Sequence, residues 1–276
     1  MAFARPKLPG SLAERSKTVR LGPDVPTLLC HADWETPTPC VLWMHGRTAF
    51  KELDPGRYQR WLRAGIATIS VDLPGHGERF ERTLQGPERT LDNFRQMVDE
   101  IDPVLDEALG RMPIDPERLA IGGMSAGGMA TLIRLTRPEL PRRFAAAAVE
   151  STTGDLETLY FGNPEIPDTR PWPATHDRDE VRSLSPMNRL DAFEPIPLLA
   201  IHTVGDAVVP WAVQERFLER LRARYAEAGA EPGLIETQTY EDTGAPDEHA
   251  GFGREAANAK DRQTAFLGRV LGAESV

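Results

Sequence analysis

The chain alternates short apolar runs with longer amphipathic stretches along most of its length. The short segments that we expect to be strands are residues 25–31, 40–45, 66–71, 118–122, 144–149, 196–202 and 234–240, of which 66–71 is rich in β-branched residues and 234–240 alternates with threonine. The amphipathic stretches, which we expect to be helices, are residues 55–64, 91–108, 126–137, 211–228 and 255–271. Strands that alternate with helices form a mostly parallel central sheet with helices on both faces, so the predicted fold class is α/β. The first two strands are the exception: the loop between them allows an antiparallel opening pair.

Residues 151–191 interrupt this alternation. They show no clear hydrophobic period, and they combine prolines with Tyr160, Phe161 and Trp172. A segment of this length is too long for an ordinary connection, and long loops over a sheet are often functional lids. We therefore expect a single domain over residues 1–276 with a small cap inserted at 151–191. A surface excursion without a catalytic part is the alternative.

Charge and cysteine content narrow the classes of function. The net charge of −10 argues against nucleic acid or an anionic membrane as a partner, because binding phosphates requires a cationic face. Cys30 and Cys40 are too few for a disulfide framework, and we expect two buried free thiols rather than a regulatory disulfide. No cysteine–histidine cluster suggests a metal, and we expect no cofactor. Without an apolar N-terminal run or an apolar span of membrane length, the default localisation is cytoplasmic.

The segment Gly123-Met-Ser-Ala-Gly127 fits the pattern G-x-S-x-G. A predicted strand precedes it and a predicted helix follows it, as the nucleophile turn of a serine hydrolase requires. Small neighbours are needed because the serine occupies a tight, strained turn. The pattern in this context predicts that Ser125 is a nucleophile.

A serine nucleophile needs a histidine base and a carboxylate that orients it, here in the chain order serine, acid, histidine. His249 lies in a polar loop after the last predicted strand, and Asp206 directly follows the strand at 196–202. We therefore predict a catalytic triad of Ser125, Asp206 and His249. The side chains that we consider and set aside are Asp242 and Asp247, expected to be solvated turn residues, His176 in the cap, and His45 and His202, expected to be structural.

An acyl-transfer site also needs two donors for the oxyanion. One is expected to be the backbone N–H of Ala126, the residue after the nucleophile. The other should come from the loop after an early strand, where His45-Gly46-Arg47 follows the apolar run 40–45. We assign this second donor to the backbone N–H of Arg47. Its side chain could meet an anionic group of a substrate or could be an ordinary surface arginine.

These segments together resemble the α/β-hydrolase superfamily. The resemblance rests on CVLWMHG before Arg47, on DLPGHG from Asp72, on RLAIGGMSAGG, and on HTVGDAVVP before Trp211. Within the superfamily, the chain is similar to small bacterial carboxylesterases grouped with dienelactone-hydrolase-like and prolyl-oligopeptidase-like catalytic domains. The resemblance implies the α/β-hydrolase fold and a structural role for His76. The dienelactone hydrolases use cysteine as nucleophile, so the serine here argues against that specific activity.

The predicted function is cleavage of a small-molecule carboxylic ester through an acyl-enzyme. Residues proposed for the substrate pocket are Met124, Tyr160, Phe161, Trp172 and Trp211. An aminopeptidase or acyl-peptide hydrolase is the alternative enzyme, and it would need an acidic site for an amine, for which Glu150 is the candidate. A binding module on a hydrolase scaffold is less favoured, because such proteins usually lose a triad residue and all three positions are filled here.

Overall fold

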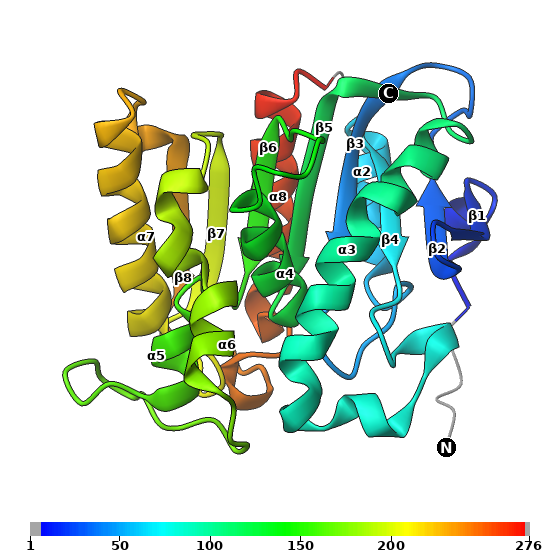
Figure 1. Ribbon diagram of the computed structural model, residues 1–276. Helices are drawn as coiled ribbons and strands as arrows, with labels where there is room; N and C mark the ends of the chain where they lie inside the picture. The colour runs from blue at the N-terminus through cyan, green and yellow to red at the C-terminus, as the bar shows by residue number, and fades with distance from the viewer. Residues whose placement is uncertain (1–6, 274–276) are drawn as a thin grey trace.

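The computed structural model describes residues 7–273. Its centre is one eight-stranded sheet, with strand order β1-β2-β4-β3-β5-β6-β7-β8 (Figure 1). The strands are β1 (Ser16–Leu21), β2 (Val25–Cys30), β3 (Thr38–Met44), β4 (Ala67–Val71), β5 (Ile114–Met124), β6 (Ala146–Glu150), β7 (Leu198–Thr203) and β8 (Ile235–Tyr240). From β4 to β8 every neighbouring pair is parallel. The mostly parallel α/β sheet predicted from the sequence is thus confirmed.

Helices cover both faces of this sheet. The α-helices are α1 (Gly10–Ala13), α2 (Pro55–Arg63), α3 (Thr90–Leu109), α4 (Ala126–Leu135), α5 (Leu156–Phe161), α6 (Arg178–Leu184), α7 (Trp211–Glu227) and α8 (Ala256–Val270). Helices α3, α4 and α7 lie in front of the sheet in Figure 1, while α2 and α8 lie behind it. The short 3₁₀ helices are η1 (Gly77–Arg79), η2 (Arg82–Gln85), η3 (Pro87–Arg89), η4 (Pro186–Ala192), η5 (Pro232–Leu234), η6 (Pro246–Glu248) and η7 (Gly253–Glu255).

The antiparallel edge of the sheet differs from the sequence prediction. Strands β2 and β3 do not pair, because β4 lies between them, antiparallel to β2 and parallel to β3. The antiparallel opening pair is instead β1 with β2, joined by a tight turn that contains Gly22 at a φ of +54°. Strand β1 was missed in the sequence because it is an edge strand whose side chains are largely exposed, so it lacks an apolar run.

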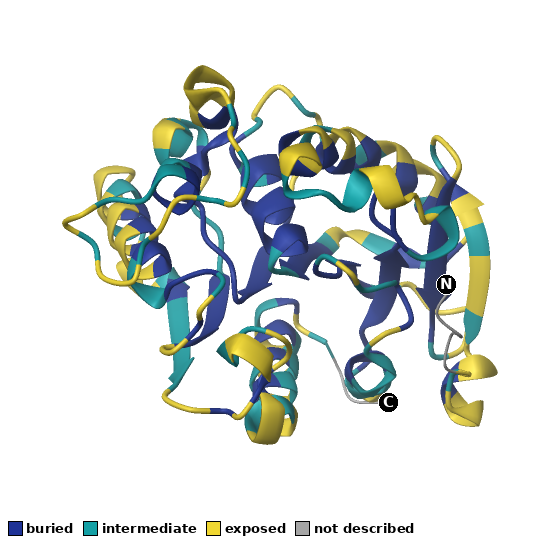
Figure 2. Ribbon diagram, turned by 90° about the horizontal axis from the view of Figure 1, so that it is seen from below, coloured by how far each residue is buried: buried dark blue, intermediate teal, exposed yellow. Residues whose placement is uncertain are grey.

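The hydrophobic core forms two layers, one on each face of the sheet. The strands and the inward faces of the helices are buried, while the outer faces of the helices and β1 are exposed (Figure 2). The five residues of β4 and the five of β6 are all buried, as expected for parallel strands covered by helices on both faces. Over residues 7–273, no helix has the length and apolar content needed to cross a membrane.

Residues 151–191 form α5, α6 and all but the last residue of η4, at the lower end of the sheet in Figure 1, where the parallel strands have their carboxyl ends. Polar contacts connect this segment to η3 and to the first residue of α3. The Tyr160 hydroxyl lies 2.6 Å from the Thr90 hydroxyl, and the Trp172 indole N–H donates to the carbonyl of Pro87 at 3.3 Å. The segment therefore packs over the carboxyl ends of the strands. In α/β proteins, ligands bind at this end of the sheet.

Candidate active site

Ser125 lies at the turn between β5 and α4. Its backbone has φ +51° and ψ −116°, a conformation that L-residues rarely adopt and that presents the side chain at the tip of the turn. Two hydrogen bonds connect the turn to the end of β6 and the residues after it. The Ser125 N–H donates to the carbonyl of Glu150 at 2.8 Å, and the Thr152 hydroxyl donates to the carbonyl of Ser125 at 2.8 Å. The strained conformation is thus fixed by hydrogen bonds from a neighbouring strand end.

Close backbone packing explains the glycines around this serine. A Cβ atom on Gly127 would lie 2.1 Å from the carbonyl oxygen of Met44, at the end of β3. A Cβ on Gly123 would lie 2.4 Å from the backbone of Gly127. Because these contacts are with backbone, no side-chain rearrangement could relieve them. The glycines therefore allow α4 to start directly against β3, and they place Ser125 beside the loop that follows Met44.

Three side chains from separate loops meet in a line. The Nε2 atom of His249 lies 2.8 Å from Oγ of Ser125, and its Nδ1 atom lies 2.8 Å from Oδ2 of Asp206. The carboxylate can only accept, so Nδ1 carries the proton and Nε2 is free to accept the serine proton. The structure thus brings together the three residues that the sequence analysis selected, with the imidazole in the tautomer that a general base requires.

Asp206 is held by its own loop. Its Oδ1 atom accepts hydrogen bonds from the N–H groups of Val208 at 2.9 Å and Val209 at 2.8 Å, while Oδ2 faces His249. The side chain is buried, so these donors compensate for its lost hydration. The segment Asp206-Ala-Val-Val-Pro forms this turn because a short carboxylate can bond to the backbone two and three residues ahead. The orientation of the carboxylate is therefore set before a substrate binds.

The other histidines near the site have structural contacts. His202 is buried at the end of β7, and its Nε2 atom lies 2.8 Å from the carbonyl of Val209. Burial lowers the pKa of His202, although the nearby Asp206 carboxylate opposes this shift. His176 contacts the carbonyl of Pro87. Asp242 pairs with Arg254 on the surface and does not contact His249.

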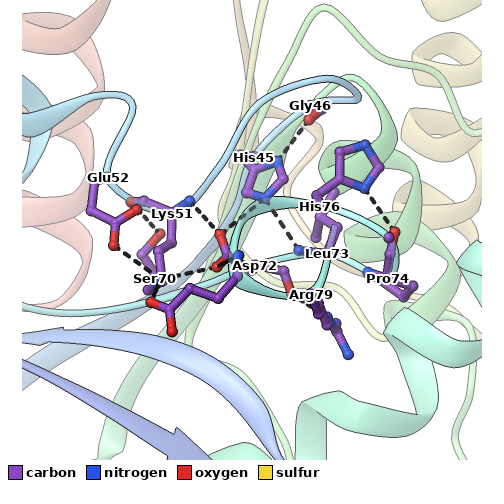
Figure 3. A network of polar contacts seen from close by, with 12 residues as sticks. His45, Gly46, Lys51, Glu52, Ser70, Asp72, Leu73, Pro74, His76 and Arg79 are labelled. Atoms are coloured by element: carbon purple, nitrogen blue, oxygen red, sulfur yellow. Dashed lines mark hydrogen bonds and ion pairs between the residues drawn. The ribbon is translucent and has the colours of Figure 1, made fainter. Parts of the chain in front are cut away.

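His45 orients the loop that follows β3 (Figure 3). Its Nε2 atom accepts from the N–H of Leu73 at 3.2 Å, so Nδ1 carries the proton and donates to the carbonyl of Gly46 at 2.7 Å. In a trans peptide the carbonyl and the next N–H point in opposite directions. Fixing the carbonyl of Gly46 therefore also fixes the direction of the Arg47 N–H. A Cβ on Gly46 would lie 3.4 Å from Cβ of Ser125, so this peptide lies beside the serine.

A buried ionic cluster supports the same loop from below (Figure 3). Asp72, at the end of β4, accepts from Nζ of Lys51 at 2.9 Å and from the backbone N–H groups of Lys51 and Glu78, each at 2.9 Å. Lys51 also pairs with Glu52 at 2.9 Å and Glu78 at 2.6 Å. His76 lies against His45, with 5.5 Å between the ring centroids. We assign this cluster a structural role because its polar groups bond to one another rather than to the serine.

A cavity of about 480 Å³ opens at Ser125. Of the predicted pocket residues, Met124, Tyr160 and Trp172 line it, together with Ser125 and His249. Residues that the sequence analysis did not select include Trp43, Phe50, Tyr58, Phe94, Leu159, Val208 and Phe252. These aromatic and aliphatic side chains come from both faces of the sheet, and their ordinary core-like patterns gave no signal of a pocket. The site is therefore mainly apolar around a polar reaction centre.

Two predicted pocket residues lie elsewhere. Phe161 and Trp211 are not among the described residues that line the cavity. The Phe161 ring lies under the guanidinium of Arg178, with 4.1 Å from Cζ to the ring centroid. The Trp211 ring packs on His202, with 5.4 Å between centroids. The position of these residues in the sequence does not determine the direction of their side chains.

Glu150 does not form the acidic site that a peptidase would need. It is buried and receives two hydrogen bonds from Arg57, at 2.6 and 2.8 Å, and one from Gln263 at 3.0 Å. It is also absent from the described residues that line the cavity. The same arginine contacts Asp54 at 3.1 Å, and Asp54 pairs with Lys260 at 2.8 Å. The carboxylate of Glu150 is therefore fully engaged within the protein.

Residues 55–274 match the prolyl oligopeptidase family. The chain belongs to the prolyl oligopeptidase family. It is therefore a serine hydrolase, as the sequence predicted. Relatives include Esterase YjfP of Escherichia coli (strain K12), 27% identical over 76% of this chain and 88% of the relative. Putative esterase YitV of Bacillus subtilis (strain 168) is 25% identical over 68% of this chain and 76% of the relative.

Solved structures show the same fold. TT1662 from Thermus thermophilus superposes with a TM-score of 0.71 at 23% identity, over 94% of this chain and 99% of that protein. A puromycin-hydrolyzing peptidase of Mycobacterium tuberculosis superposes with a TM-score of 0.68 at 21% identity, over 95% of this chain and 42% of the peptidase. At these identities the similarity establishes the fold, and the predicted α/β-hydrolase architecture is confirmed.

Proposed function

We propose that the protein is a serine carboxylesterase that hydrolyses small-molecule esters through an acyl-enzyme, with Ser125, His249 and Asp206 as its catalytic residues. The observation that carries the proposal is the continuous chain of hydrogen bonds from Ser125 to His249 to Asp206, with Ser125 and His249 in the lining of a mainly apolar cavity. The esterase names of the relatives from Escherichia coli and Bacillus subtilis support an ester as the substrate.

In the first half of the reaction, Oγ of Ser125 attacks the ester carbonyl while Nε2 of His249 takes the serine proton. The backbone N–H groups of Ala126 and Arg47 donate to the oxyanion of the tetrahedral intermediate. Ala126 begins α4, so its N–H has no intrahelical acceptor and lies at the positive end of the helix dipole. His249 then protonates the leaving alcohol, and the acyl group remains on Ser125.

In the second half, a water molecule attacks the acyl-enzyme. Nε2 of His249 removes a proton from this water, and the same N–H group later returns the proton to Ser125 as the carboxylic acid leaves. Asp206 holds the imidazole in place and stabilises its positive charge in both halves. The segment 151–191 contributes Tyr160 and Trp172 to the cavity, and we propose that it acts as the cap over the substrate.

Peptide substrates are the alternative for this family. Aminopeptidase activity needs a carboxylate that is free to bind the substrate's amino group, and Glu150 is instead bonded to Arg57 and Gln263. The described residues that line the cavity contain one carboxylate, Asp54, which is paired with Arg57 and Lys260. These pairings favour the ester over the peptide.

We also propose a cytoplasmic localisation. Cys30 and Cys40 are free and buried, and burial raises the pKa of both thiols, which keeps them protonated and unreactive. Free thiols are typical of reducing compartments. Fractionation of cells that produce the full-length protein, with a cytoplasmic and a periplasmic marker, tests this localisation; recovery with the periplasmic marker would contradict it.

The function is tested with 4-nitrophenyl acetate, butyrate and octanoate, and with aminoacyl 4-nitroanilides. We expect the wild type to hydrolyse at least one ester, and Ser125→Ala to lower kcat by at least about 10⁴-fold, since it removes the nucleophile. The matched control is Ser183→Ala, an exposed serine of α6. Faster cleavage of the anilides than of all the esters would favour a peptidase, and ester hydrolysis unchanged in Ser125→Ala would overturn the assignment of the nucleophile.

A further inference from the structure

A second cavity adjoins the one at Ser125. Its volume is about 440 Å³, and the two cavities share Arg47, Leu159, Trp172 and Val208 in their linings. The other described residues of its lining are apolar except for two threonines and an arginine: Pro87, Pro171, Pro173, Pro210, Ala207, Val213, Thr158, Thr169 and Arg170. A substrate held at Ser125 could therefore extend past Trp172 into a second compartment with apolar walls.

Arginines give this second cavity its charge. Arg47 and Arg170 line it, and no described residue of its lining is acidic. Nη2 of Arg47 donates to the carbonyl of Gln85 at 3.0 Å, and Nη2 of Arg170 donates to the carbonyl of Ala207 at 2.8 Å. Within residues 7–273, neither guanidinium lies in ion-pair distance of a carboxylate. Since a guanidinium has five N–H donors, both keep donors available for a ligand.

Lys260 and Arg57, which line the first cavity, form ion pairs with carboxylates. Lys260 pairs with Asp54 at 2.8 Å, and Arg57 pairs with both Asp54 and Glu150. Their charge is therefore compensated within the protein. Arg47 lies where the two cavities meet, with its Cζ atom 5.9 Å from the centroid of the Trp172 ring. The uncompensated positive charge is thus confined to the second cavity and its junction with the first, in a chain whose net charge is −10.

We propose that the second cavity binds a carboxylate carried by the substrate, so the preferred substrates are esters with an apolar chain that ends in a carboxylate. Arg47 and Arg170 supply the positive charge that such a group requires, because arginine donors match carboxylate geometry and bind it more strongly than neutral acceptors. The apolar walls between the arginines and Ser125 accommodate the chain. This substrate class rests on the proposed esterase function and deepens it.

Two pairs of probes test the proposal and locate the carboxylate. Monomethyl adipate and methyl hexanoate differ by a carboxylate at the end of the acyl chain, and 4-acetoxybenzoate and methyl 4-acetoxybenzoate differ by a carboxylate on the leaving group. We expect kcat/KM to favour the charged member in at least one pair, and added salt to reduce that preference by screening it. A preference for the neutral member in both pairs would overturn the proposal.

Substitution of Arg47 and Arg170 tests whether these side chains cause the preference for the charged ester. We expect Arg170→Met and Arg47→Met each to lower the ratio of kcat/KM for charged over neutral ester by at least about tenfold, because each removes charge-assisted hydrogen bonds. Arg170→Lys should retain part of the ratio. The matched control is Arg63→Met, an exposed arginine of α2 outside both linings, which should leave the ratio unchanged. An equal ratio in wild type and both cavity variants would overturn the proposal.

A binding measurement separates this proposal from the esterase function. Calorimetric titration of monomethyl adipate into Ser125→Ala, and into Ser125→Ala with Arg170→Met, needs no turnover. We expect the dissociation constant to be at least about tenfold larger in the double variant. If no ester is hydrolysed but this difference is observed, the esterase assignment fails and the carboxylate site stands. If esters are hydrolysed and the two dissociation constants are equal, the carboxylate site fails and the esterase stands.

Discussion

At the scale of single residues, Asp206 shows how the loop sequence prepares the site. One carboxylate oxygen is occupied by the N–H groups of Val208 and Val209, which leaves the other directed at Nδ1 of His249. Both oxygens of Asp206 must accept hydrogen bonds, so a carboxylate is needed and an amide is not equivalent. An amide can accept on one side only, and it donates on the other.

Asp206→Asn should therefore fold normally but lose activity. The amide oxygen can accept from Val208 and Val209, whereas the amide NH₂ would donate to Nδ1 of His249 and force the proton onto Nε2. The imidazole could then no longer accept the serine proton. We expect kcat to fall by about 10³- to 10⁴-fold, as measured with a 4-nitrophenyl ester.

The control for this variant is Asp242→Asn. Asp242 is an exposed carboxylate on the same loop as His249, and it pairs with Arg254. We expect this substitution to leave kcat unchanged. A loss of activity in Asp242→Asn as large as that in Asp206→Asn would contradict the assignment of the acid.

The sequence predicted the three residues of this line but not the whole pocket. Ser125, Asp206 and His249 each follow a strand, and strand ends can be located from apolar runs and turn residues. Phe161 and Trp211 were wrongly expected in the pocket because a helix residue can face either way, and local spacing does not determine which. The arginine pair of the second cavity joins two loops far apart in the chain, and only the tertiary fold brings them together.

At the scale of elements, the contact between α4 and β3 determines the position of Ser125. The backbones of the two elements are in direct contact, since a Cβ added at Gly127 would overlap the carbonyl oxygen of Met44. This packing could be anticipated at the glycines of the G-x-S-x-G pattern. The pairing of β2 with β4 rather than β3 could not be anticipated, because these strands are distant in sequence and only the tertiary fold brings them together.

Gly127→Ala tests the close approach of these elements. A Cβ at 2.1 Å from a backbone carbonyl oxygen requires the helix to move, so we expect a loss of unfolding free energy of about 3 kcal/mol and a lower kcat. Urea denaturation followed by circular dichroism measures the first effect, and hydrolysis of a 4-nitrophenyl ester measures the second.

Gly268→Ala is the matched control in another helix. Gly268 lies in α8, and a Cβ there would have nothing within 4 Å, so alanine should raise the unfolding free energy by about 0.5 to 1 kcal/mol through its helix propensity. Equal effects of the two substitutions would show that the α4–β3 contact is not tight.

At the scale of the whole molecule, buried histidines couple stability to pH. Burial lowers the pKa of His45 to about 3, and it also lowers the pKa values of His76 and His202. A histidine in the unfolded chain has a pKa near 6.5, so between this pH and the lower pKa of the folded state it is protonated only when the protein is unfolded. The unfolded state therefore takes up more protons as the pH falls below about 6.5, and the folded state loses stability.

We expect unfolding free energy to be lower at pH 5 than at pH 7, by about 2 kcal/mol from His45 alone. Burial opposes ionisation of Asp54 and Asp72, but nearby cations and hydrogen bonds outweigh it and lower the pKa values of both, so their contribution to stability is lost only near and below pH 4. Urea denaturation at the two pH values measures the difference, and His45→Gln should reduce it. Equal unfolding free energies at pH 5 and pH 7 would contradict the lowered pKa values of the buried histidines.

Covalent modification identifies the nucleophile of the protein directly. A fluorophosphonate ester phosphonylates an activated serine, and mass spectrometry of the digested protein locates the adduct. We predict one adduct on the peptide that contains Ser125, complete loss of ester hydrolysis when labelling is complete, and greatly slowed labelling in Asp206→Asn. Labelling at another residue, or full activity in a protein phosphonylated at Ser125, would contradict the proposed mechanism.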